Sequence, residues 1–125
     1  MINKRHDETK RLGVIAPAGG LVGGKPYLVG TVFGFAIATV AAGERGVLER
    51  EGGFLVQAEA VGAPLTRGKA IYWEPGRPNA EFHTDKNDAG GILVGYAALD
   101  LETDVPAGQK REIEVFIERR IHVPA

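Results

Sequence analysis

Residues 19–26 read GGLVGGKP and come close to the nucleotide-binding loop G-x-x-x-x-G-K-[ST]. Gly19, Gly24 and Lys25 occupy the motif positions, whereas Pro26 stands where the motif has Ser or Thr. In such a loop the backbone N–H groups, together with the N-terminus of the next helix, hold the phosphates of the nucleotide. The chemistry that this stretch could perform is therefore ATP binding.

The residues after Lys25 do not fit that chemistry. They read PYLVGTVFGFAIA, which has the composition of strands and no helical face. Proline biases the preceding residue away from the α region, and Pro26 lacks the hydroxyl that would ligate Mg²⁺. Asp100, at the end of an apolar run, is only a weak candidate for a second metal ligand, and no helix connects the strands as a parallel sheet requires. We therefore predict a glycine-rich turn between strands, with Lys25 on the surface and no phosphate nest ahead of a helix.

Glu81, His83 and Asp85 form a second candidate cluster, because alternate residues of a strand lie on one face. They could bind a cation or form an acid–base pair, but a solvated hairpin face explains the pattern as well. The chain has no cysteine and no serine, which excludes disulfides, thiolate catalysis, zinc–thiolate sites and serine nucleophiles. We expect no catalytic residue, no cofactor and no metal site.

Size and charge set further limits. The 125 residues suit one domain, and 44% apolar with 25% charged residues is ordinary for a globular protein. The formal net charge is -1, and the basic residues at 4–11 and 110–120 are interleaved with acids, so no general attraction to nucleic acid or anionic lipid is expected. No apolar run reaches the roughly 18 residues of a membrane span, and no signal-peptide core comes after the charged N-terminus. We predict neither a nucleic-acid nor a membrane partner.

Short strands separated by turns make up the predicted fold. The chain has 18 glycines and 7 prolines, and no stretch shows an apolar period of 3.6 over three turns. Residues 41–46 are expected to form a loop. Strands are expected at 12–16, 26–30, 31–39, 53–60, 69–75, 80–84, 91–99 and 110–120. This spacing predicts an all-β fold, a small antiparallel sandwich or barrel with Gly/Pro-rich turns and little helix. We divide the chain into a charged N-terminal arm (1–11), a single β-domain (12–120) and a C-terminal tail (121–125).

Particular residues should stand out within these strands. Gly34 interrupts an apolar strand and indicates a bulge or a close packing contact. Tyr72 and Trp73 are adjacent and so should face opposite ways, one into the core and the other available as an interface anchor. Phe116 breaks the polar side of its strand, either as an exposed contact residue or as cover for another edge.

The order and spacing of two segments resemble a family of small tailed-phage and prophage proteins. The segments are IAPAGGLVGGKPYLVGTVFGFAIATVAAGE (15–44) and GFLVQAEAVGAPLTRGKAIYWEPG (53–76). Members of that family are often labelled predicted RecA/RadA-type phage recombinases, and others are known as capsid decoration, or cement, proteins. The likeness covers about residues 12–99. The positions that match the family pattern are Pro17, Gly19, Gly20, Pro26, Val29, Gly30, Phe33, Gly34, Gly43, Glu44, Gly68, Tyr72 and Trp73.

The resemblance implies an all-β structural protein on the outside of an icosahedral head. Decoration proteins of this kind bind the major capsid protein and themselves, commonly as homo-oligomeric trimers. They are found on the capsid surface of the virion and in the host cytoplasm during assembly. The matched positions look like turn and core residues, so they carry the fold. The arm is the expected partner contact, with Ile2, Asn3, Lys4, Arg5 and His6 as its candidate residues.

Two other functions remain open at this point. An ATP-dependent phage recombination protein would need the nucleotide site argued against above, and a basic track for DNA. A β-sandwich module for a ligand such as a carbohydrate could use Trp73 or Tyr96. The sequence favours the capsid decoration protein over both.

Overall fold

The computed structural model describes residues 11–87, 90–98 and 104–117, and all regular structure in this part of the chain is β. These residues form two compact units whose boundary lies between Glu51 and Gly52. The all-β fold class is therefore confirmed. The single domain over residues 12–120 stays a prediction, and each unit is described here by itself. The candidate arm residues 2–6 and the tail lie outside the described residues.

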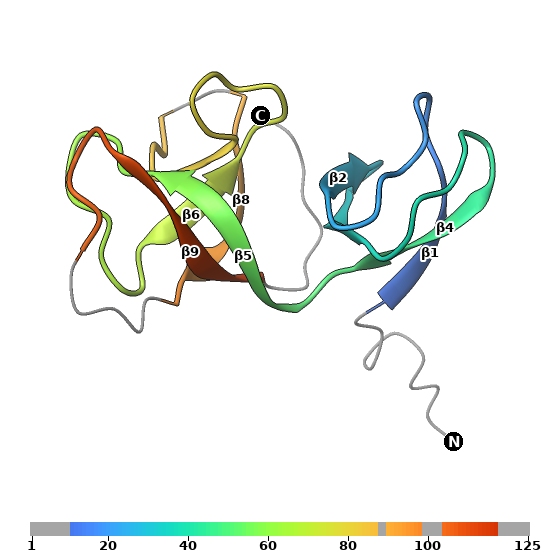
Figure 1. The fold of residues 1–125 in the computed structure, drawn as a ribbon, viewed down its shortest axis with the longest axis horizontal. Helices are drawn as coiled ribbons and strands as arrows, with labels where there is room; N and C mark the ends of the chain where they lie inside the picture. Colours follow the sequence, from blue (N-terminus) through green and yellow to red (C-terminus); the bar gives the residue numbers. More distant parts are fainter. Residues whose placement is uncertain (1–10, 88–89, 99–103, 118–125) are drawn as a thin grey trace. The chain divides into compact units, whose positions relative to one another are not determined.

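The first unit is a four-stranded antiparallel sheet with the order β1-β4-β3-β2 (Figure 1). Its strands are β1 (Arg11–Ile15), β2 (Pro26–Val29), β3 (Val32–Ala36) and β4 (Arg45–Glu49). β2 and β3 form a hairpin in which Val29 pairs with Val32. The two-residue connection contains Gly30 at a φ of 64°, a left-handed conformation that glycine adopts without steric cost.

A small apolar core holds this sheet together. Ala16, Leu21, Ala36 and Leu48 are buried in it, and partly buried residues pack around them: Val14, Tyr27, Val29, Val32 and Val40. Gly34 is a close packing contact, as expected, because a Cβ there would lie 2.7 Å from the backbone oxygen of Glu49. The absence of a side chain at Gly34 thus lets β3 approach β4.

β4 is the strand that the sequence prediction missed. Residues 41–46 were expected to be a loop, but β4 already begins at Arg45. The strand is short, has charged residues at both ends and contains Gly46, so it resembles a turn in composition. It forms because tertiary packing buries Gly46 and Leu48, while Arg45 and Val47 face solvent. Context outweighs the weak intrinsic preference of these residues.

The second unit is a closed five-stranded barrel with the order β5-β7-β6-β8-β9. Its strands are β5 (Gly52–Glu59), β6 (Ala70–Trp73), β7 (Phe82–His83), β8 (Ile92–Ala97) and β9 (Lys110–Ile117). The long β5–β9 ribbon, from Gly52↔Ile117 to Glu59↔Lys110, is visible in green and dark red (Figure 1). The pairing of β5 with β7 is parallel, whereas the other strand pairs of the described residues are antiparallel, as the predicted fold class has them.

Alternating side chains fill the barrel. On β5, Val56 and Ala58 are buried and Leu55 and Gln57 are exposed. On β9 the three apolar residues Ile113, Val115 and Ile117 are buried. The period of two in the sequence therefore predicts both strands correctly.

Gly95 lies at the most crowded backbone position of the barrel. A Cβ on Gly95 would overlap the backbone oxygen of Phe116. Opposite it, the register of β6 and β8 shifts between Ile71 and Tyr72. The glycine within the apolar run at 91–99 thus marks an irregularity of the ladder, as glycine in strands often does.

Candidate interaction surfaces

The glycine-rich stretch at 19–26 forms two consecutive turns that lead into β2. Gly20 donates to Pro17 over 2.8 Å and Lys25 donates to Val22 over 3.1 Å. Gly19, Gly20 and Gly24 have φ values of 91°, 77° and 87°, which only glycine adopts readily. Gly23 lies in a tight position instead, since a Cβ there would lie 3.3 Å from the Cα of Ala38. The predicted turn between strands is confirmed.

The backbone N–H groups of residues 20–25 all donate to acceptors within the protein. A phosphate-binding loop leaves such groups free to point at the phosphates. Here the acceptors, in chain order, are Pro17 O, Val40 O, Tyr27 Oη, Thr39 Oγ1, Ala36 O and Val22 O, at 2.7 to 3.1 Å. Lys25 leads directly into strand β2 and not into a helix. In this conformation the stretch connects three segments of the first unit and does not offer a phosphate nest.

The cluster Glu81, His83 and Asp85 is divided among separate structural hydrogen bonds. The Glu81 carboxylate accepts from Trp73 Nε1 at 3.3 Å and from the N–H of Gly76 at 3.0 Å. His83 is fully buried, and its Nδ1 accepts from the N–H of Asp85 at 3.0 Å. No group of three or more acidic or histidine residues in the described chain is arranged to hold a metal ion. These residues stabilise the β7 hairpin and its turns.

Tyr72 and Trp73 face opposite sides of β6, as predicted. Trp73 is buried, with 4% of its surface exposed. Tyr72 is half-buried and stacks on His83, with the ring centroids 6.1 Å apart. Trp73 is therefore the core residue of the pair, and the role of Tyr72 as an interface anchor stays a prediction.

A nearly buried ion pair braces one end of the barrel. Arg77 Nη1 lies 2.6 Å from Glu59 Oε1 and also donates to the carbonyl of Ala80 at 2.8 Å. Burial raises the pKa of Glu59, but hydrogen bonds from Arg77 and Asn79 and the charges of Arg77 and His83 outweigh it. The pKa of Glu59 therefore lies below its ordinary value, and the carboxylate is held ionised.

Exposed apolar residues form a strip on the outside of the barrel. Tyr96 and Phe116 are cross-strand partners on β8 and β9, and their rings meet edge to face at 5.7 Å. Phe116 pairs with Gly53 on β5, and a Cβ on that glycine would meet the Phe116 ring at 2.9 Å. Leu55, on the same face of β5, is 68% exposed. We call Gly53, Leu55, Tyr96 and Phe116 the barrel strip; its three apolar side chains are suited to an interface.

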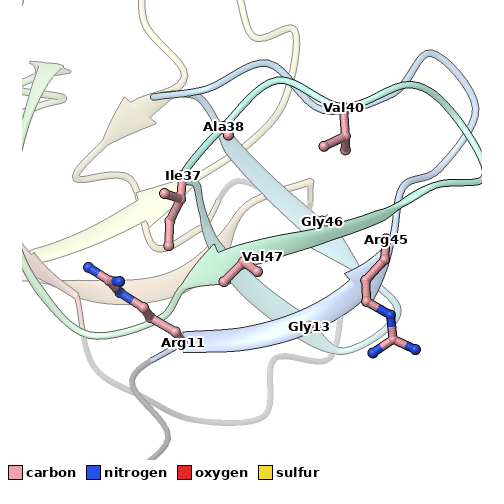
Figure 2. A pocket seen from close by; sticks show the side chains of 8 residues that line it. All are labelled: Arg11, Gly13, Ile37, Ala38, Val40, Arg45, Gly46 and Val47. Carbon is pink, nitrogen blue, oxygen red and sulfur yellow. The ribbon is translucent and has the colours of Figure 1, made fainter.

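A second exposed surface is a hollow of about 610 Å³ on the outer face of the first unit. Gly13 on β1 pairs with Val47 on β4 in the middle of this face. Figure 2 shows Val47 between the side chains of Arg11 and Arg45, with Ile37 above Arg11. We call this region the sheet hollow; its lining residues are Arg11, Gly13, Ile37, Ala38, Val40, Arg45, Gly46 and Val47.

Two guanidinium groups give the sheet hollow its charge. Arg45 Nη1 lies 3.7 Å from the point where a Cβ of Gly13 would stand, so this cation borders the open space above the glycine. Arg11 Nε lies 3.6 Å from Glu49 Oε2, with the Arg11 side chain 65% exposed. Within the described part of the chain, no carboxylate forms an ion pair with Arg45. The hollow therefore combines an apolar floor with cationic ends.

A comparison with protein-family models gives a match to the phage cement protein family over residues 6–114. The chain belongs to this family. Searches of curated proteins and of solved structures found no match. The match spans the whole region of the resemblance seen in the sequence, and the cement proteins are structural proteins with a role in capsid decoration.

The family-pattern residues of this cement protein lie mostly in turns and in packed positions. Pro17, Gly19 and Gly20 form the first turn of the 19–26 stretch, and Pro26 begins β2. Five further pattern residues are buried or half-buried in strands: Val29, Phe33, Gly34, Tyr72 and Trp73. The other four are exposed: Gly30, Gly43, Glu44 and Gly68. They lie in two different units, so the structure does not bring them together into one site.

The sheet hollow was not predicted from the sequence. Its residues come from β1, from the segment after β3 and from the unrecognised strand β4. One signal was available: RGVLE alternates in side-chain character, with Arg45 and Val47 on one face. That period of two was too short to be distinguished from the surrounding loop.

Proposed function

We propose that this cement protein is a non-enzymatic decoration protein that binds the outside of a phage or prophage head. The observation that carries the proposal is the family match, which spans residues 6–114. Its direct partner is the major capsid protein, and its own copies associate as a homo-oligomer, with a trimer favoured. The protein is then present in the host cytoplasm during assembly and on the capsid surface in the finished virion.

The exposed surfaces support this role. The barrel strip presents Leu55, Tyr96 and Phe116, which are 68%, 40% and 39% exposed. Aromatic residues in exposed patches are typical anchors of protein interfaces. The sheet hollow offers a second surface, on the other unit. A chain with two such surfaces suits the simultaneous contacts that a cement protein makes.

The mechanism that we propose is multivalent attachment. Each subunit offers a contact of modest area, but an oligomer that spans several capsid subunits gains avidity through effective concentration. The N-terminal arm, with Ile2, Asn3, Lys4, Arg5 and His6, extends the contact by ordering on the shell. Fixing a segment in one conformation on a surface has an entropic cost, so the arm adds affinity only where its contacts exceed that cost.

The test is binding to heads that lack the protein. Purified protein is mixed with heads assembled from the major capsid protein of the same phage, and the heads are collected by sedimentation. We expect saturable co-sedimentation at a fixed ratio to the capsid subunit. A parallel equilibrium titration with labelled ATP and Mg²⁺ tests the recombinase alternative. Saturable ATP binding that Lys25→Ala abolishes, with no binding to heads, would replace the proposal with that alternative.

A further inference from the structure

We propose that the sheet hollow binds an extended, acidic segment of a partner protein, with two carboxylates four residues apart and an apolar residue midway. The inference rests on the proposed function only for the source of the segment, a protein of the phage head. The recognition chemistry is set by the hollow itself. Its residues all belong to the first unit, so the argument needs only that unit.

The strand positions of the two arginines set the spacing of the carboxylates. Arg11 pairs with Glu49 in the β1–β4 register, and Arg45 lies four residues before Glu49 on β4. At about 3.4 Å per residue, the backbone positions of the two arginines lie about 14 Å apart along the strands. In an extended chain, residues i and i+4 lie on the same face at the same separation. One carboxylate can therefore reach each guanidinium.

The floor between the cations sets the residue in the middle. Gly13 has no side chain, and a Cβ placed on it meets nothing closer than 3.7 Å. Beside it, Val47 is 38% and Ile37 is 44% exposed. An apolar side chain at the midpoint of the segment would cover both and fill the space above Gly13. Burying that apolar surface supplies affinity, and the charges supply orientation.

The carboxylate of Glu49 near the hollow does not prevent the binding of an acidic segment. The pair between Arg11 and Glu49 is long, at 3.6 Å, and solvated, with side-chain exposures of 65% and 34%. Exposed ion pairs of this kind contribute little to the free energy of folding, so Arg11 can exchange Glu49 for a partner carboxylate. Arg45 has no ion pair to break within the described residues, so it can bind a partner carboxylate directly.

The sheet edge favours an extended segment over a helix. β1 is the outer strand of the sheet among the described residues. The backbone N–H of Ala16 donates to the carbonyl of Glu44. Because hydrogen-bonded and non-hydrogen-bonded residues alternate along an antiparallel pair, the even-numbered residues of β1 direct their backbone groups toward β4. The odd-numbered residues Arg11, Gly13 and Ile15 therefore direct their backbone groups to the open edge. An extended segment that crosses the hollow and reaches this edge would find unpaired backbone groups of β1 there, whereas a helix has no free backbone groups to pair with them.

The primary test is fluorescence anisotropy with the labelled peptide Thr-Glu-Thr-Val-Thr-Glu-Thr and the full chain. We expect saturable binding that weakens with added salt. A peptide with both Glu replaced by Gln, and one with the two Glu three residues apart, should bind at least about fivefold more weakly. Absence of saturable binding, or equal binding of the three peptides, would overturn the inference.

Two variants and a control locate the binding. Arg45→Glu reverses one cation, and Gly13→Val places a side chain in the hollow at a strand position where a Cβ meets nothing closer than 3.7 Å. Each should weaken peptide binding at least about fivefold. Lys25→Glu makes the same charge change on an exposed turn of the same unit, outside the hollow. Equal losses for Lys25→Glu and Arg45→Glu, or full binding by Gly13→Val with an unchanged melting temperature, would overturn the site.

Binding of the variants to phage heads tests whether the acidic segment belongs to a head protein. If it belongs to a head protein, Gly13→Val should reduce head occupancy as well as peptide binding. Loss of peptide binding with full head occupancy would overturn the head as its source and leave the decoration function standing. Failure of the unaltered protein to bind heads would instead contradict the proposed function, while peptide binding still tests the hollow.

Discussion

At the scale of single residues, one glycine and one ion pair mark two tightly packed positions of the barrel. Gly95 stands where a Cβ would overlap the backbone oxygen of Phe116. Glu59 and Arg77 meet at 2.6 Å with only 17% of each side chain exposed. Both features act through local geometry, and both can be tested without any partner.

We expect Gly95→Ala to destabilise the barrel by about 1–3 kcal/mol, because β8 and β9 must separate to admit the methyl group. Trp73, the only tryptophan of the chain, is buried in the barrel, so its fluorescence during urea unfolding measures this unit. Gly13→Ala is the matched control, since it is a strand glycine with room for a Cβ. Equal midpoints for Gly95→Ala and the unaltered protein would contradict the packing described here.

The ion pair should make the stability of the barrel sensitive to acid. The pKa of Glu59 is lowered from 4.5, so the unfolded chain binds its proton at a higher pH than the folded chain does. The stabilisation is therefore present above about pH 4.5 and lost as the pH falls through the folded pKa. Glu59→Gln should reduce the melting temperature at neutral pH and flatten its fall between about pH 5 and pH 3. Glu112→Gln, an exposed carboxylate of β9, is the control, and an identical acid profile for both variants would refute the assignment.

At the scale of elements, the period of two decides what the sequence can predict. β5 and β9 carry apolar alternation, and their existence and buried faces can be read from it. β3 is apolar on both faces and is buried almost throughout. β4 has only five residues with charges at both ends, so its strand character comes from packing on Leu21 and from pairing with β1. The sheet hollow depends on that pairing, which no local pattern contains. The parallel pairing of β5 with β7, like the pairing of β1 with β4, joins segments that are distant in the sequence, so no local pattern predicts it.

The barrel strip belongs to this scale because three strands build it. We expect Phe116→Lys to leave the barrel folded, since the ring is on the outer face and 39% exposed, but to weaken self-association or head binding several-fold. Analytical ultracentrifugation and co-sedimentation with heads measure the two effects. Gln57→Lys, exposed on the same barrel, is the control. Unchanged association and head occupancy in Phe116→Lys would remove the strip from the interface.

At the scale of the whole molecule, the chain combines two β units and is matched by the cement protein family over most of its length. The described residues contain no helix long and apolar enough to cross a membrane. The glycine-rich stretch that resembles a nucleotide loop instead ties β2, β3 and the segment before β4 together through its own N–H groups.

The arm gives a prediction at this scale. β1 begins at Arg11, which pairs with Glu49, so a deletion of residues 2–10 leaves the first sheet intact. We expect the shortened protein to keep its melting temperature and to bind heads more weakly than the full chain. Undiminished occupancy of heads by the shortened protein would count against a contact through Ile2, Asn3, Lys4, Arg5 and His6.

The most direct measurement of the central claim is electron cryomicroscopy of heads with and without the protein. The account predicts additional density on the outer surface of the shell, at a fixed number of copies per capsid subunit, into which the sheet and the barrel fit. It also predicts that the density disappears when the protein is omitted and returns when it is added back. Heads that are identical in the two preparations, or added density confined to the interior, would contradict the assignment of this chain as a decoration protein.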